Sequence, residues 1–168
     1  MDHYRVVWSL IETAREKAGG DSHRHARLLE KILRLAPVDT LPAVHHFFRV
    51  HLAKLNHWNI LGPATIVGCG QSDDGFKDFR GWIISQGSEF FERMLKEPDC
   101  LADVPSEDPI EEWYFEFDYI PATIYEEDTG KEIPIFTVED EDVIKGKPWS
   151  GESELSSRFP RLWSRFKE

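Results

Sequence analysis

A chain of 168 residues has the length of one ordinary domain, and 40% hydrophobic residues with 11 Gly and 10 Pro exclude collagenous, low-complexity and wholly disordered proteins. Its 20 basic and 31 acidic residues give a net charge of −11. A field of that sign repels phosphates and anionic lipids, so the composition disfavours direct binding to nucleic acid or to a membrane.

Apolar residues recur at helical spacing through the N-terminal half. The pattern predicts helices over residues 2–18, 22–36 and 41–55, with Asp21 or Ser22 capping the second and Asp39 or Thr40 capping the third. A fourth apolar segment covers residues 58–67. Two more helices are expected, one beginning after Ser72 and one over residues 88–96.

The C-terminal half is less regular. Trp113, Phe115 and Phe117 alternate as in a strand, but the apolar residues of 109–120 fit a helix equally well, and we favour the helix. A short helix from Pro121 to Thr129 follows, then an extended segment over residues 131–142 and a terminal helical turn over residues 160–166. The sequence therefore predicts an all-α fold, a mainly helical bundle that forms a single domain over residues 1–168.

Acidic residues are concentrated in one stretch of the chain. Residues 97–142 hold 17 Asp and Glu against one basic residue, Lys131. This excess is larger than solubility requires, so it favours docking to a basic protein. The candidate docking residues are Glu111, Glu112, Glu116, Asp118, Glu126, Glu127 and Asp128.

A second candidate site is the helix start at Asp73 and Asp74. Paired carboxylates hold a divalent cation or act as acid and base, but acids at a helix start also stabilise it with no chemistry. Arg80 falls near the apolar face of this helix and, if buried, needs a carboxylate partner, for which we expect Asp74. The candidate functional motif is Asp73, Asp74, Phe76, Arg80 and Trp82.

Histidines and cysteines give weaker signals. His46 and His57 are 11 residues apart, nearly the same helical face, and with Asp73 they form an alternative zinc or iron site. Cys69 is either a nucleophile with a lowered pKa or, as we favour, a buried or turn cysteine. No nucleotide or metalloprotease motif is present, so the sequence indicates no cofactor. Two unpaired cysteines and no export segment indicate a reduced, cytoplasmic protein.

The segment from Cys69 to Phe76, continued by residues 79–83 and 86–87, resembles the signature of a bacterial family named domain of unknown function 4240. Weaker similarities lie at residues 8–12, 97–102, 125–130 and 159–163. The resemblance implies a small, mostly helical, cytosolic domain with no established reaction, and so no catalytic residues to carry over. Larger relatives with an additional domain are labelled molybdenum-metabolism regulators, and since this chain has no room for that domain, regulation is not transferred.

Two functions are consistent with these features. The first is a non-enzymatic acidic module, an inhibitor or immunity-like partner of a nucleic-acid-acting protein, with salt-sensitive binding. The alternative is a metal-assisted or acid/base hydrolase that uses Asp73 and Asp74, with Arg80 and His46 or His57 in the same pocket. In a third interpretation the motif is purely structural, and its polar groups form hydrogen bonds that stabilise the core.

Overall fold

The structure is a computed structural model that describes residues 2–105 and 117–167. Helices form the regular structure of these residues, where the one β-bridge, between His57 and Lys145, is isolated. The predicted all-α class is therefore confirmed. The elements are α1 (Asp2–Ala18), α2 (Ser22–Leu33), η1 (Val38–Thr40), α3 (Leu41–Leu55), α4 (Trp58–Ile66), α5 (Asp73–Ser85), α6 (Ser88–Lys96), η2 (Pro98–Asp103), α8 (Tyr119–Thr129), α9 (Glu152–Arg158) and α10 (Pro160–Phe166).

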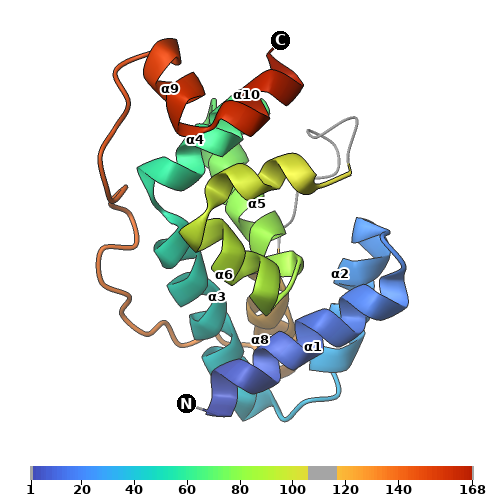
Figure 1. Cartoon of the computed structure of the whole chain (residues 1–168). Coiled ribbons are helices and arrows are strands. Elements are labelled where there is room, and N and C mark those ends of the chain that lie inside the picture. The colour runs from blue at the N-terminus through green and yellow to red at the C-terminus, as the bar shows by residue number, and fades with distance from the viewer. Residues whose placement is uncertain (1, 106–116, 168) are drawn as a thin grey trace.

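The helices pack around α3. Helix α3 contacts α5, α8 and α1, while α1 pairs with α2 at one end of the molecule. At the other end α9 and α10 lie beside α4 (Figure 1), and α10 also contacts η2. The chain between α8 and α9 has no helix and runs along the outside of α3 and α4 (Figure 1). Within the described ranges, no helix is long and apolar enough to cross a bilayer.

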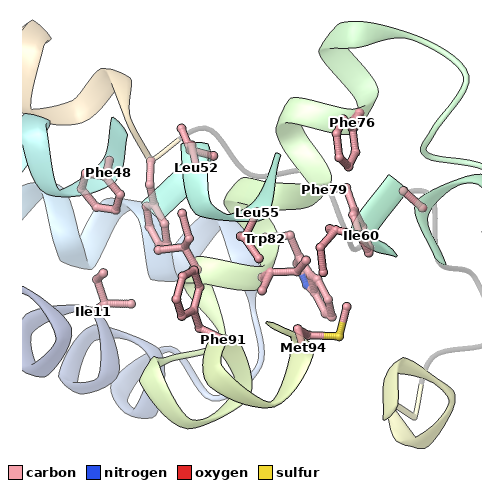
Figure 2. Close-up of a cluster of buried hydrophobic side chains, with 14 of the residues drawn as sticks. Ile11, Phe48, Leu52, Leu55, Ile60, Phe76, Phe79, Trp82, Phe91 and Met94 are labelled. Carbon is pink, nitrogen blue, oxygen red and sulfur yellow. The ribbon is translucent and has the colours of Figure 1, made fainter. Parts of the chain in front are cut away.

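One hydrophobic core joins these helices. Leu55 of α3, Phe79 of α5, Phe91 of α6 and Ile11 of α1 are each at most 1% exposed. Figure 2 shows their side chains in one cluster with Met94. Each such residue contributes about 1.5–3 kcal/mol by burial, so this cluster fixes how α1, α3, α5 and α6 are placed.

Most helix boundaries agree with the sequence pattern, and two details do not. The helix predicted over residues 22–36 ends at Leu33, because the chain then turns toward Pro37. Thr40 is the N-cap residue of α3, one of the two predicted, but its side chain makes no capping bond and its hydroxyl donates instead to the carbonyl of Pro37 at 2.6 Å. Asp21 does cap α2, as its carboxylate accepts from the backbone N–H of Arg24 at 2.8 Å.

The C-terminal half contains two helical segments that were not predicted from the sequence, the 3-10 helix η2 and the helix α9. Helix α9 precedes the predicted terminal helix α10. The segment over residues 131–142 pairs with no strand in the described chain, and its last four residues form a turn. The choice between helix and strand falls mainly on residues 106–116, which lie outside the described residues. From Phe117 onward, the chain enters α8 at Tyr119.

Candidate functional site

The acidic motif forms the first turn of α5. Ser72 is the N-cap, and its hydroxyl accepts a hydrogen bond from the backbone N–H of Gly75 at 3.0 Å. Asp73 and Asp74 follow it with exposed side chains, where they stabilise the positive end of the helix. A Cβ atom at Gly75 would lie 2.8 Å from the carbonyl oxygen of Cys69, so the preceding loop requires glycine here. The arrangement gives these residues a structural role in helix initiation.

The aromatic residues of the motif belong to the core. Phe76 and Trp82 are each 5% exposed, and the rings of Phe79 and Trp82 stack with centroids 6.0 Å apart. Figure 2 shows all three side chains turned into the hydrophobic cluster. The predicted functional motif therefore divides into an exposed acidic turn and a buried aromatic face.

Arg80 links α5 to α3. Its guanidinium lies over the ring of Phe76, 4.6 Å from the centroid, and Nη1 donates to the carbonyl of Leu52 at 3.1 Å. That carbonyl is in the last turn of α3, where a cation stabilises the negative end of the helix. Burial lowers the pKa of Arg80 to about 10, although the charges of nearby carboxylates oppose the shift. The predicted contact with Asp74 is wrong, because Arg80 uses backbone carbonyls as acceptors.

Two more polar residues cap helices that are distant in sequence. Glu12 of α1 accepts from the backbone N–H of Ser88 at 2.9 Å and from its hydroxyl at 2.6 Å, at the start of α6. Asp99 of η2 accepts from the backbone N–H groups of Arg161 and Leu162 at 3.1 and 3.0 Å, at the start of α10. Both lie in segments that carry the weaker family resemblance. Arg80, Glu12 and Asp99 thus act as helix caps that join elements, whereas Ser72 caps its own helix.

The predicted alternative metal site is not assembled. Among the described residues, no group of three or more His, Cys, Asp or Glu side chains could hold a metal ion. His57 caps α4 by accepting from the backbone N–H of Asn59 at 3.0 Å, whereas His46 stays on α3 against Phe136. Asp73 is exposed at the start of α5.

Cys69 does not have the environment of a nucleophile. It is half-buried, and burial together with the charge of Asp78 raises the pKa of its thiol to about 11. A thiol with that pKa is almost entirely protonated at neutral pH. The interpretation as a turn cysteine is therefore the one that the structure favours.

The candidate docking acids differ in their surroundings. Glu111, Glu112 and Glu116 lie outside the described residues. Asp118 is mostly buried in an ion pair with Lys77 at 2.8 Å, so it is not available to a partner. The hydrogen bond and charge of Asp118 hold the pKa of Lys77 above its usual value against the opposing effect of burial. The remaining three, Glu126, Glu127 and Asp128, are exposed at the end of α8.

A cavity of about 730 Å³ was not anticipated from the sequence. It lies between the α1–α2 turn and the facing parts of α5, α6 and η2. Its lining includes Arg15 and Arg93 together with four acidic residues, and Gln86 accepts a hydrogen bond from Arg15 at 3.1 Å. Because carboxylates outnumber guanidinium groups, this lining does not favour an anionic ligand.

Substitutions in the first turn of α5 separate capping from metal chemistry. We expect Ser72→Ala to lower the free energy of unfolding by about 1 kcal/mol, because it leaves the N–H of Gly75 without its acceptor. Asp73→Ala combined with Asp74→Ala should cost about 0.3–1 kcal/mol per residue through the lost helix-dipole interaction. Thermal unfolding with and without Mg²⁺, Mn²⁺ and Zn²⁺ measures both effects. A metal-dependent rise in Tm that the double variant loses would instead support the enzyme alternative.

Comparison with known proteins identifies a protein family that matches this chain. No curated protein and no solved structure matches the chain. The model of the family described as "Protein of unknown function (DUF4240)" matches residues 3–127, from α1 into α8. This range covers more than half of the chain and includes the acidic turn, Arg80 and the Glu12 and Asp99 caps. The chain therefore belongs to the DUF4240 family.

Proposed function

We propose that the protein is an acidic interaction module that docks a basic protein partner. The distribution of the acids in residues 97–142 supports this. Among those that the structure describes, four form ion pairs with basic residues outside that stretch: Asp103 with Arg161, Asp118 with Lys77, Glu127 with Arg34, and Glu141 with Arg49. These pairs attach the acidic stretch to the rest of the fold, and other described acids, such as Glu126 and Asp128, stay exposed at the surface.

The observation that carries the proposal is the cluster of acids at the C-terminal end of α8. Glu126, Glu127 and Asp128 occupy the last turn, which contains no basic residue, and Gly130 ends the helix in a left-handed conformation. Carboxylates at this end face the negative pole of the helix and destabilise it. Arg34 partly offsets the cost at Glu127, 2.8 Å away. A basic partner would offset the rest, so binding supplies a physical reason for an arrangement that weakens the fold.

A nucleic-acid-acting protein is the partner class that this charge fits. Such proteins present clustered Lys and Arg side chains that neutralise phosphates. An acidic surface on a fold of net charge −11 competes for the same side chains. The role that follows is that of an inhibitor, with an association rate that falls as salt rises.

Neutralising the exposed acids should separate stability from binding. We expect Glu126→Gln combined with Asp128→Asn to raise the free energy of unfolding by about 0.3–1 kcal/mol per residue, since the unfavourable helix-dipole interaction is removed. The same variant should lose capture of a basic protein from a lysate at low salt. Denaturant unfolding measures the first effect, and affinity capture with mass spectrometry measures the second.

A matched variant controls for net charge. Glu16→Gln combined with Glu92→Gln removes the same two charges from exposed positions on α1 and α6. This control should keep the capture that the wild type shows at low salt, and raised salt should abolish it in both proteins. If no captured protein depends on Glu126 and Asp128, the proposal is wrong.

A further inference from the structure

The segment of residues 133–144, which we name the apolar–acidic segment, is held in place by α3 and the residue after it. Arg49 donates through Nη1 to the carbonyl of Phe136 at 2.6 Å and forms an ion pair with Glu141. The side-chain amide of Asn56 donates to the carbonyl of Glu141 at 2.9 Å, and the backbone carbonyl of Asn56 accepts from the backbone N–H of Lys145 at 2.9 Å. Arg49 and Asn56 thus fix a stretch that has no helix of its own.

The same segment exposes large apolar side chains on both sides of an acidic turn. Ile135 is 70% exposed, Phe136 49%, Val143 56% and Ile144 36%. Isolated exposed apolar residues are ordinary on a protein surface, but two adjacent pairs on one anchored segment are typical of a binding site. Because the backbone is already tied to α3, a partner would bind these side chains at a low entropic cost.

Phe136 packs on His46 of α3. Its ring lies edge-on to His46, with centroids 5.4 Å apart. The Nδ1 atom of His46 is buried and has no hydrogen-bond partner among the described residues. A buried polar atom without a partner costs free energy. The edge-to-face contact itself is favourable, so the ring has a defined place on α3 while Phe136 stays 49% exposed to a partner.

Charge decides what kind of partner fits the segment. Glu139, Asp140 and Asp142 lie exposed between the two apolar pairs, in a turn closed by the N–H of Val143 on the carbonyl of Asp140 at 3.2 Å. A second copy of this chain that pairs through this segment by two-fold symmetry would bring these acids against the same acids, and an anionic membrane would repel them. A basic protein surface with apolar depressions complements both features.

We infer that the apolar–acidic segment is the docking surface itself: Ile135, Phe136, Val143 and Ile144 insert into a basic partner while the acids between them pair with its Lys or Arg side chains. The inference rests on the proposed function and deepens it. Arg49 is a positioning residue, because it fixes Phe136 and the acidic turn together without facing the partner.

Two peptide probes test the inference on the intact protein. One is a peptide of alternating Lys and Leu, and the other is an oligolysine of the same charge. We expect the Lys–Leu peptide to bind about tenfold more tightly than the oligolysine, because only its Leu side chains can pack against the apolar pairs. In Ile135→Ser combined with Val143→Ser this difference should disappear. Leu35→Ser combined with Val6→Ser, which removes exposed apolar residues elsewhere, should keep it.

The outcomes distinguish the inference from the proposal beneath it. If Ile135→Ser/Val143→Ser keeps the tenfold difference, while Glu126→Gln/Asp128→Asn weakens both peptides, the inference is wrong and the acidic module stands. If neither peptide binds at low salt, both are wrong. Arg49→Met leaves the apolar residues unchanged but removes the contacts that hold the segment. It should therefore reduce the difference in affinity between the two peptides. Binding to phosphatidylserine vesicles, or a dimer that Ile135→Ser/Val143→Ser abolishes, would also overturn the inference.

Discussion

Lowering the pH from about 6.5 to about 4 is expected to destabilise the protein by roughly 3 kcal/mol for each of two buried histidines, His25 and His51. Burial lowers the pKa of both from 6.5 to about 4. Between these pH values each histidine is protonated in the unfolded chain but neutral in the folded one. The free energy of unfolding therefore has its full value above pH 6.5 and falls as the pH approaches 4. Domains of this size are stable by about 5–15 kcal/mol, so the combined loss is a large part of the total.

The two histidines have different surroundings, but both support α1. His25 of α2 is 4% exposed, and its Nε2–H donates to the carbonyl of Ile11 at 3.0 Å, with Arg15 nearby. His51 of α3 is 3% exposed, and its Nδ1–H donates to the carbonyl of Phe47 at 2.7 Å. The aromatic rings of Tyr4, Trp8, Phe47 and Phe91 pack around His51.

Denaturant unfolding at a series of pH values measures the predicted loss, and NMR of the imidazole C2 protons assigns it. Both buried rings should remain neutral until the pH nears 4 or the protein unfolds. Lys54 near His51 also disfavours protonation. His3→Gln combined with His23→Gln changes only exposed rings and should leave the pH dependence as it is. Titration of either buried histidine near 6.5 in the folded protein would contradict the prediction.

Local contacts explain why the helices could be predicted from the sequence. The caps at Asp21 and Ser72 accept from N–H groups only three residues away, so a short motif contains both partners. The apolar periodicity of α1, α3 and α6 is equally local, and their bounds agree with it. Helix α9 has few apolar residues and several serines, which are weak helix formers, so the pattern gave no signal there.

Contacts between distant residues explain what the sequence could not predict. Asp99 accepts from residues 62 and 63 positions away, and no spacing rule connects them. For Arg80 the sequence indicated a buried charge that needs a partner, but not that the free carbonyl at the end of α3 would serve. Composition likewise showed an excess of acids without showing that Asp118 and Glu141 are used internally. The partners of these four side chains differ from the predicted ones, or were not predicted, because tertiary packing brings them together.

Replacing Gly62 by Ala is expected to destabilise the docking of α9 and α10 on α4. Gly62 is buried inside α4, and a Cβ atom there would overlap the ring of Phe159 and lie 3.2 Å from a methyl group of Leu155. Phe159 is 3% exposed, so its ring has little room to move away. Overpacking of this kind costs about 1–3 kcal/mol.

Coupling to Phe159 makes the Gly62→Ala test decisive. In a helix interior, Ala is usually more stable than Gly by about 0.5–1 kcal/mol, but Pro63 disfavours the α conformation of a preceding residue that has a Cβ atom, so the sign of the effect alone does not identify overpacking. We expect a loss, measured by denaturant unfolding, together with faster proteolysis of residues 145–151 as α9 and α10 separate from α4. Phe159→Leu should cost stability in the wild type but less in the Gly62→Ala background, because the smaller side chain makes room for the methyl group. A gain in stability from Gly62→Ala, with no coupling to Phe159, would show that α10 and α9 do not depend on this contact.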